Sequence, residues 1–155
     1  MEKVYYPDKR LSIDESMVLW RGRLFFKQYI KGKQHKCGSC TIYSGARDDD
    51  TGGVNHAEKV VKHFMGKKLN KGHSLFMDNF YNSISVAKFL LENKTYVTGT
   101  LRANRKGNPC EITSETLKRV ECVEMFTEDG ISILKWKDRR DVLMISSEFD
   151  GEMTE

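Results

Sequence analysis

The sequence predicts an α/β fold, and two observations carry this prediction. Between residues 11 and 102, short β-prone runs alternate with two segments whose apolar residues recur at helical spacing. From Val120 onward, three strand-like runs follow one another through short polar connections, which predicts a small antiparallel meander. The chain has 155 residues, so we expect this pattern to fold as one domain.

The first half of the chain predicts two strands and a helix. Apolar and polar residues alternate in "LSIDESMVLW", which predicts a strand at 11–17, and "TIYSG" predicts a short strand at 41–45. After a polar loop, Asn55 and Glu58 have the spacing of a capping box, and Gly66 is a typical helix end. The apolar residues between them have helical spacing and predict a helix: Ala57, Val60, Val61, Phe64 and Met65.

The second half predicts a strand, a helix, a strand and the meander. "HSLFMD" is typical of a buried strand, and "SISVAKFLLENK" predicts a helix with Ser83 as its N-cap. "TYVTGTLR" predicts a strand that ends in a basic turn. The meander strands are expected at 120–126, 131–136 and 141–146, with a hairpin turn at Asp129-Gly130.

Charge is distributed unevenly along the chain. The net charge is +4, but residues 107–155 hold six Lys and Arg against twelve Asp and Glu, a net charge of −6. The preceding residues therefore form a basic body, which fits a polyanionic partner such as nucleic acid, although ordinary solvated surface explains the composition equally well. No apolar run has the length of a membrane span and no signal peptide is visible, so we expect a soluble intracellular protein without a membrane partner.

The cysteines give a weak metal signal. Cys37 and Cys40 have zinc-like spacing and His35 lies beside them, but Cys110 and Cys122 do not form a second pair of that spacing. Small unligated thiols are the preferred interpretation.

Two aspartates end strand-like runs. Asp14 follows "LSI" and Asp78 follows "LFM", and functional groups of α/β sheets lie at or beyond strand ends. Two carboxylates on neighbouring strands are suited to divalent metals such as Mg²⁺. Spacing alone leaves a second interpretation open, in which both carboxylates accept backbone N–H bonds at strand ends.

Three stretches resemble the catalytic domain of piggyBac-type transposases. They are "LSIDESMVLWRGRLFFKQYIKGKQHKCG", "KGHSLFMDNFYNSISVAKFLLENKTYVTGTLRANRKG" and "LKWKDRRDVLMISS". The resemblance implies a partial RNase H-like core at 1–109, followed at 110–155 by the start of a β-rich insertion. It also implies metal-dependent cleavage and transfer of DNA strands, with Mg²⁺ or Mn²⁺ as cofactor and Asp14 and Asp78 as catalytic metal ligands.

The sequence departs from that family in its metal triad. The family's third Asp follows the insertion in a Gly-Gly-Val-Asp motif, whereas this chain carries Gly-Gly-Val-Asn at 52–55, before Asp78. The third ligand is therefore expected to be absent, metal binding to be weak, and the chain to be inactive in transposition on its own. The segment around Cys37 and Cys40 is also shorter than in the family, which leaves a core strand in doubt.

The resemblance implies DNA as the partner, assembly as a homodimer and nuclear localisation. Clustered basic side chains displace counterions from phosphates, and we predict eight of them as DNA contacts. These are Arg21, Arg23, Lys27, Lys33, Lys36, Arg102, Arg105 and Lys106. The alternative function is a non-catalytic DNA-binding or protein-binding module that keeps the fold and has lost the reaction.

Overall fold

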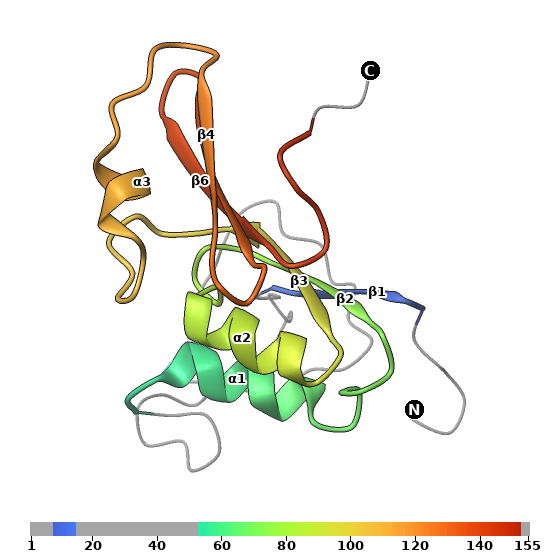
Figure 1. Ribbon diagram of the computed structural model, residues 1–155. Helices are drawn as coiled ribbons and strands as arrows, with labels where there is room; N and C mark the ends of the chain where they lie inside the picture. The colour runs from blue at the N-terminus through green and yellow to red at the C-terminus, as the bar shows by residue number, and fades with distance from the viewer. Residues whose placement is uncertain (1–7, 15–52, 153–155) are drawn as a thin grey trace, which may run out of the picture.

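Six strands form one mixed sheet in the computed structural model, which describes residues 8–14 and 53–152 (Figure 1). The strand order is β1-β2-β3-β6-β5-β4. Strands β1 (Arg10–Ile13), β2 (Ser74–Met77) and β3 (Tyr96–Thr100) run parallel to one another. The sheet then turns antiparallel through β6 (Asp141–Ser146), β5 (Ser132–Lys137) and β4 (Cys122–Phe126). The predicted meander is thus confirmed, and β6 joins it to β3.

Helices α1 (His56–Met65) and α2 (Ile84–Glu92) lie together on one side of the parallel strands (Figure 1). Both present an apolar stripe to the sheet, because their apolar residues recur at three and four positions. The core between helices and strands is made of residues with at most 7% of their surface exposed: Val60, Val61, Met65, Leu75, Met77, Val86, Ala87, Leu90 and Val97. None of the helices in the described ranges is long and apolar enough to cross a bilayer.

The ends of the two helices test the predicted caps. Ser83 accepts a hydrogen bond from Val86 N–H at 3.2 Å and is the N-cap of α2, as predicted. Helix α1 ends at Gly66, also as predicted. The capping box was wrong: Asn55 adopts a left-handed conformation with φ 59° and its side chain makes no cap, while Glu58 pairs with Lys62 at 2.7 Å. An ion pair one turn along the helix has replaced the reciprocal cap.

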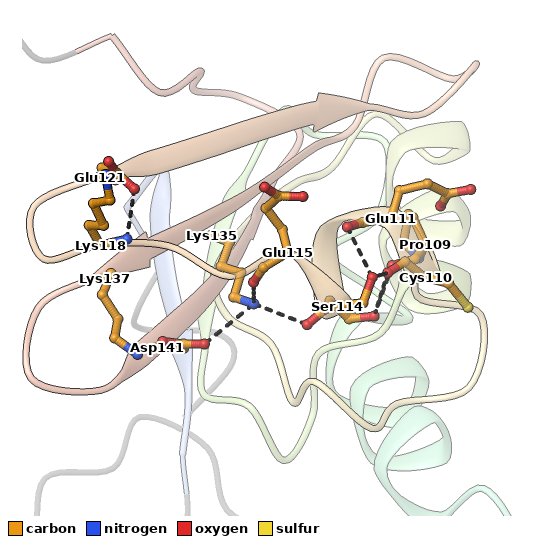
Figure 2. A network of polar contacts seen from close by, with 11 residues as sticks. Pro109, Cys110, Glu111, Ser114, Glu115, Lys118, Glu121, Lys135, Lys137 and Asp141 are labelled. Carbon is orange, nitrogen blue, oxygen red and sulfur yellow. Dashed lines mark hydrogen bonds and ion pairs between the residues drawn. The ribbon is translucent and has the colours of Figure 1, made fainter.

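The short helix α3 (Cys110–Ser114) packs on the meander through a buried lysine (Figure 2). Lys135 on β5 is 5% exposed, and its Nζ donates to the carbonyls of Thr113 at 3.0 Å and Glu115 at 2.6 Å. The same Nζ lies 3.3 Å from Asp141 Oδ2. Since carbonyls and a carboxylate surround this ammonium, its burial is compensated, and the residues after α3 are fixed to the sheet.

Several sequence predictions concern residues that lie partly or wholly outside the described ranges. The strand predicted at 11–17 is seen as β1, which ends at Ile13; Asp14 follows the strand, and residues 15–17 lie outside the described residues. The strand at 41–45 and the Cys37/Cys40 pair also lie outside them. The predicted division at residue 109 stays a prediction. Strands from both sides of it lie in one sheet, since β3 pairs with β6.

Candidate functional site

The two predicted aspartates lie at the same edge of the sheet. Strand β1 pairs with β2 in parallel, and Ile13 stands opposite Met77 as the last pair of the register. Asp14 and Asp78 directly follow these two residues, and both are exposed. Neighbouring strands are separated by about 4.8 Å, so the main chain at Asp14 and the main chain at Asp78 leave the sheet side by side at the carboxyl ends of the strands.

A tight turn after β2 fixes the position of Asp78. Its Oδ1 accepts the Phe80 N–H at 2.9 Å, and its carbonyl accepts the Asn82 N–H at 3.2 Å. The side chain therefore folds over its own turn, as Asp commonly does two residues before an N–H group. Ser83 then opens α2, so that the connecting segment 78–83 is short and is anchored by hydrogen bonds at Asp78 and Ser83.

Asn82 fastens this segment to two strands. It is 1% exposed, and its Nδ2 donates to the carbonyls of Met77 at 3.0 Å and Thr100 at 2.9 Å. Gly99 makes room for this amide: a Cβ there would lie 1.9 Å from Met77 O and 2.6 Å from Asn82 Nδ2. The sequence patterns did not predict a role for either residue. The glycine inside a β-prone run was the available signal, because such a glycine often marks a close approach of backbone.

Two arginines from the turn after β3 lie against the same segment. Arg105 donates from Nε to the Asn82 carbonyl at 3.1 Å, and from Nη2 to the carbonyls of Asn79 at 3.2 Å and Phe80. Arg102 donates from Nε to Asn79 Oδ1 at 2.9 Å and lies 5.4 Å from the Phe80 ring centre. Cationic groups thus stand beside the segment that follows Asp78.

The surroundings of Arg105 shift the pKa of its guanidinium. Burial lowers the pKa of its guanidinium, the neighbouring charge of Arg102 lowers that pKa further, and Asp78 acts in the opposite direction. Arginine stays protonated at any physiological pH. Arg105 is therefore a permanent, partly desolvated cation close to the Asp78 turn.

The predicted DNA contacts divide into three groups. Arg102 and Lys106 are exposed, as a phosphate contact requires. Arg105 is partly buried and donates to main-chain carbonyls instead. The remaining five lie outside the described residues: Arg21, Arg23, Lys27, Lys33 and Lys36.

Within residues 8–14 and 53–152, no three His, Cys, Asp or Glu side chains are grouped as a metal site would require. Asp14 and Asp78 are the acidic residues that directly follow the last register pair of β1 and β2.

Two comparisons identify the family to which this arrangement belongs. The sequence model of the DDE transposase family described as "Transposase IS4" matches residues 1–153, and the chain belongs to this family. A solved structure, the piggyBac transposase synaptic complex with hairpin DNA, superposes with a TM-score of 0.76 and 27% sequence identity. The match covers 97% of this chain and 36% of that chain, so this chain spans about a third of its length.

These findings confirm the resemblance to piggyBac-type transposases and the α/β fold class. The chain corresponds to part of a transposase catalytic domain. Transposases of this kind generally use a divalent metal ion.

Proposed function

We propose that Asp14 and Asp78 hold a divalent metal ion for cleavage and transfer of DNA strands in an RNase H-like domain. One observation carries the proposal: the two carboxylates follow the paired residues Ile13 and Met77 at the carboxyl edge of adjacent parallel strands. Functional groups of α/β sheets gather at this edge.

The donor set fits a hard cation. Mg²⁺ prefers oxygen ligands, is usually held by one or two carboxylates, and completes its coordination with water and substrate phosphates. Both carboxylates are exposed, so water and phosphate can reach them. Mn²⁺ prefers similar ligands and is the more convenient probe.

A bound divalent ion would activate the attacking oxygen and stabilise the leaving oxygen of a phosphodiester. The protein's own contribution is positional. Asp78 is oriented by its hydrogen bond from Phe80 N–H, and Asn82 keeps the segment 78–83 attached to β2 and β3. The exposed cations of Arg102 and Lys106 attract the phosphate backbone toward this edge.

DNA is the partner that this proposal requires. The similar piggyBac structure is a complex with hairpin DNA. We extend the proposal to assembly as a homodimer and to nuclear localisation, which light scattering and fluorescence microscopy of the tagged chain would test.

Metal titration of the full chain tests the proposal. Calorimetry with Mn²⁺ should detect a site whose affinity falls about tenfold or more in Asp14→Asn and in Asp78→Asn, because each change removes an anionic ligand. Asp8→Asn is the matched control: Asp8 is an exposed carboxylate at the opposite end of β1, and its loss should leave the affinity unchanged.

A DNA assay separates the catalytic proposal from its alternative. Nicking of supercoiled DNA that requires Mn²⁺ and disappears in both variants would support catalysis. If none of the carboxylate changes affects Mn²⁺ affinity, and DNA binding depends steeply on salt without needing metal, the non-catalytic DNA-binding module is the correct function.

A further inference from the structure

The orientation of the Asp78 carboxylate depends on the turn that follows it. Residues 78–83 connect β2 to α2, and the Asp78 carboxylate is directed by a single described hydrogen bond, from Phe80 N–H. That bond is exposed to solvent, and an exposed hydrogen bond alone holds a side chain weakly. A second element has to keep Phe80 in place if Asp78 is to be preorganised.

Arg105 supplies this second element from a distant part of the sequence. One guanidinium donates to the carbonyls of Asn79, Phe80 and Asn82, three of the four residues that follow Asp78. Arg105 lies 23 to 26 residues away from them in sequence. The geometry suits arginine, because its planar fork presents several N–H donors in fixed directions.

We propose that Arg105 is a positioning residue that orients the Asp78 carboxylate by clamping the carbonyls of residues 79, 80 and 82. This role rests on the proposed function of Asp78 as a metal ligand. It differs from the phosphate contact predicted from the sequence, because Nε and Nη2 of Arg105 are directed at the protein's own main chain. The exposed neighbours Arg102 and Lys106 remain the predicted phosphate contacts of this turn.

For the removal of Arg105, the proposal predicts a change in metal affinity opposite in sign to the change expected from its charge alone. A fixed positive charge beside a cation site weakens metal binding, so removing that charge should strengthen binding if Arg105 acts only through its charge. If Arg105 acts by orienting Asp78, its removal should weaken binding. The sign of the change in affinity therefore distinguishes the two roles.

The test measures Mn²⁺ affinity and the hydrogen exchange of the Phe80 amide in the ¹⁵N-labelled full chain. In Arg105→Gln we expect the Phe80 amide to exchange about tenfold faster and Mn²⁺ affinity to fall about tenfold, the effect typical of losing a group that orients a metal ligand. Arg105→Lys should recover part of both, since an ammonium can still donate to one or two of the carbonyls. Exchange of the Thr127 amide in the β4–β5 hairpin should not change.

Lys106→Gln is the matched control, because it removes one positive charge from an exposed position of the same turn. It should leave exchange at Phe80 unchanged, while DNA binding weakens and its salt dependence falls by about one unit of slope. The proposal is overturned if Arg105→Gln behaves like Lys106→Gln, if it strengthens Mn²⁺ binding, or if it lowers thermal stability with both readouts unchanged. If the unaltered chain binds no Mn²⁺, the proposed function fails, and exchange at Phe80 alone decides whether Arg105 orients Asp78.

Discussion

Arg105 beside the Asp78 turn and Lys135 in the meander are both partly or fully buried cations that bind main-chain carbonyls, but they differ in their carboxylate partners. Each is a cation that reaches the main-chain carbonyls of a segment far away in sequence. In the meander, Lys135 also pairs with the Asp141 carboxylate at 3.3 Å. At the edge of the parallel strands, Arg105 meets carbonyls, and the Asp14 and Asp78 carboxylates stay exposed. A cation bound to carbonyls therefore stabilises the fold while leaving nearby carboxylates accessible to a metal.

The largest predicted effect is a loss of stability from a substitution beside the candidate site, at Gly99. Gly99→Ala would place a Cβ 1.9 Å from Met77 O and 2.6 Å from Asn82 Nδ2, and the first of these atoms is backbone that cannot turn aside. Strand β2 or β3 has to shift, and Asn82 loses its bridge between them. We expect the free energy of unfolding to fall by about 3 kcal/mol, measured by urea denaturation.

Gly66→Ala is the control for this change. Gly66 is exposed and has right-handed helical backbone angles, and a Cβ there would come no closer than 3.4 Å to Lys62 O. Alanine fits, so stability should stay the same or rise by about 0.5 kcal/mol. Equal losses in both variants would show that the close approach at Gly99 does not limit the fold.

The second prediction concerns a loss of stability from a substitution in the meander, at Lys135. Lys135→Met keeps the length of the buried stem and removes the donor to the Thr113 and Glu115 carbonyls. Leaving these carbonyls unsatisfied should lower the free energy of unfolding by about 2 kcal/mol. Lys137→Met, on the same strand with a more exposed side chain, should cost less than about 1 kcal/mol. If both substitutions lower the free energy of unfolding equally, the buried hydrogen bonds of Lys135 do not stabilise the fold more than the exposed ion pair of Lys137.

The sequence predicted those elements whose signal is local. Helices α1 and α2, strands β2 and β3 and the meander each carry their own periodicity or turn residues, and their positions agree with the structure within a few residues. Strands β1 and β2, which precede Asp14 and Asp78, are neighbours in the sheet. This agrees with the expectation that both aspartates end neighbouring strands, while their role as a site stays a prediction.

The contacts around Asp78 were not predictable in the same way. Asn82 reaches Thr100 and Arg105 reaches Asn79, and each contact joins residues separated by at least 18 positions. No periodicity encodes such pairs. The capping box failed for a related reason: residue spacing matched the motif, but the left-handed backbone at Asn55 does not hold its side chain in a cap.

The third prediction concerns the element that follows the site. Ser83→Ala removes the oxygen that accepts the Val86 N–H at the start of α2. We expect a loss of about 1 kcal/mol in the free energy of unfolding, with faster amide exchange confined to the first turn of α2. Ser85→Ala is the control, because that hydroxyl is exposed and contacts the protein through Ser83. A loss spread over the meander would contradict a local capping role.

The smallest predicted effect depends on pH and belongs to the meander. A hydrogen bond from Lys137 is the main cause that holds the pKa of Asp141 below its ordinary value. Desolvation opposes this shift, and a weaker hydrogen bond from Lys135 adds to it. A carboxyl whose pKa is lowered by folding stabilises the protein when ionised. Its contribution is complete above about pH 5, and is lost as the pH falls through its folded pKa.

Asp141→Asn should therefore lower stability slightly at pH 7 and reduce the further loss between pH 5 and pH 3, measured as urea midpoints. The effect is small because the side chain is exposed and solvent screens its ion pairs. In 1 M NaCl the difference between variant and unaltered chain should shrink, because screening then acts within about 3 Å. Identical pH profiles of the two proteins at low salt would show that Asp141 adds nothing to the stabilisation of the buried Lys135 ammonium. The Thr113 and Glu115 carbonyls would then bind this cation alone, just as the carbonyls of the segment after Asp78 bind Arg105.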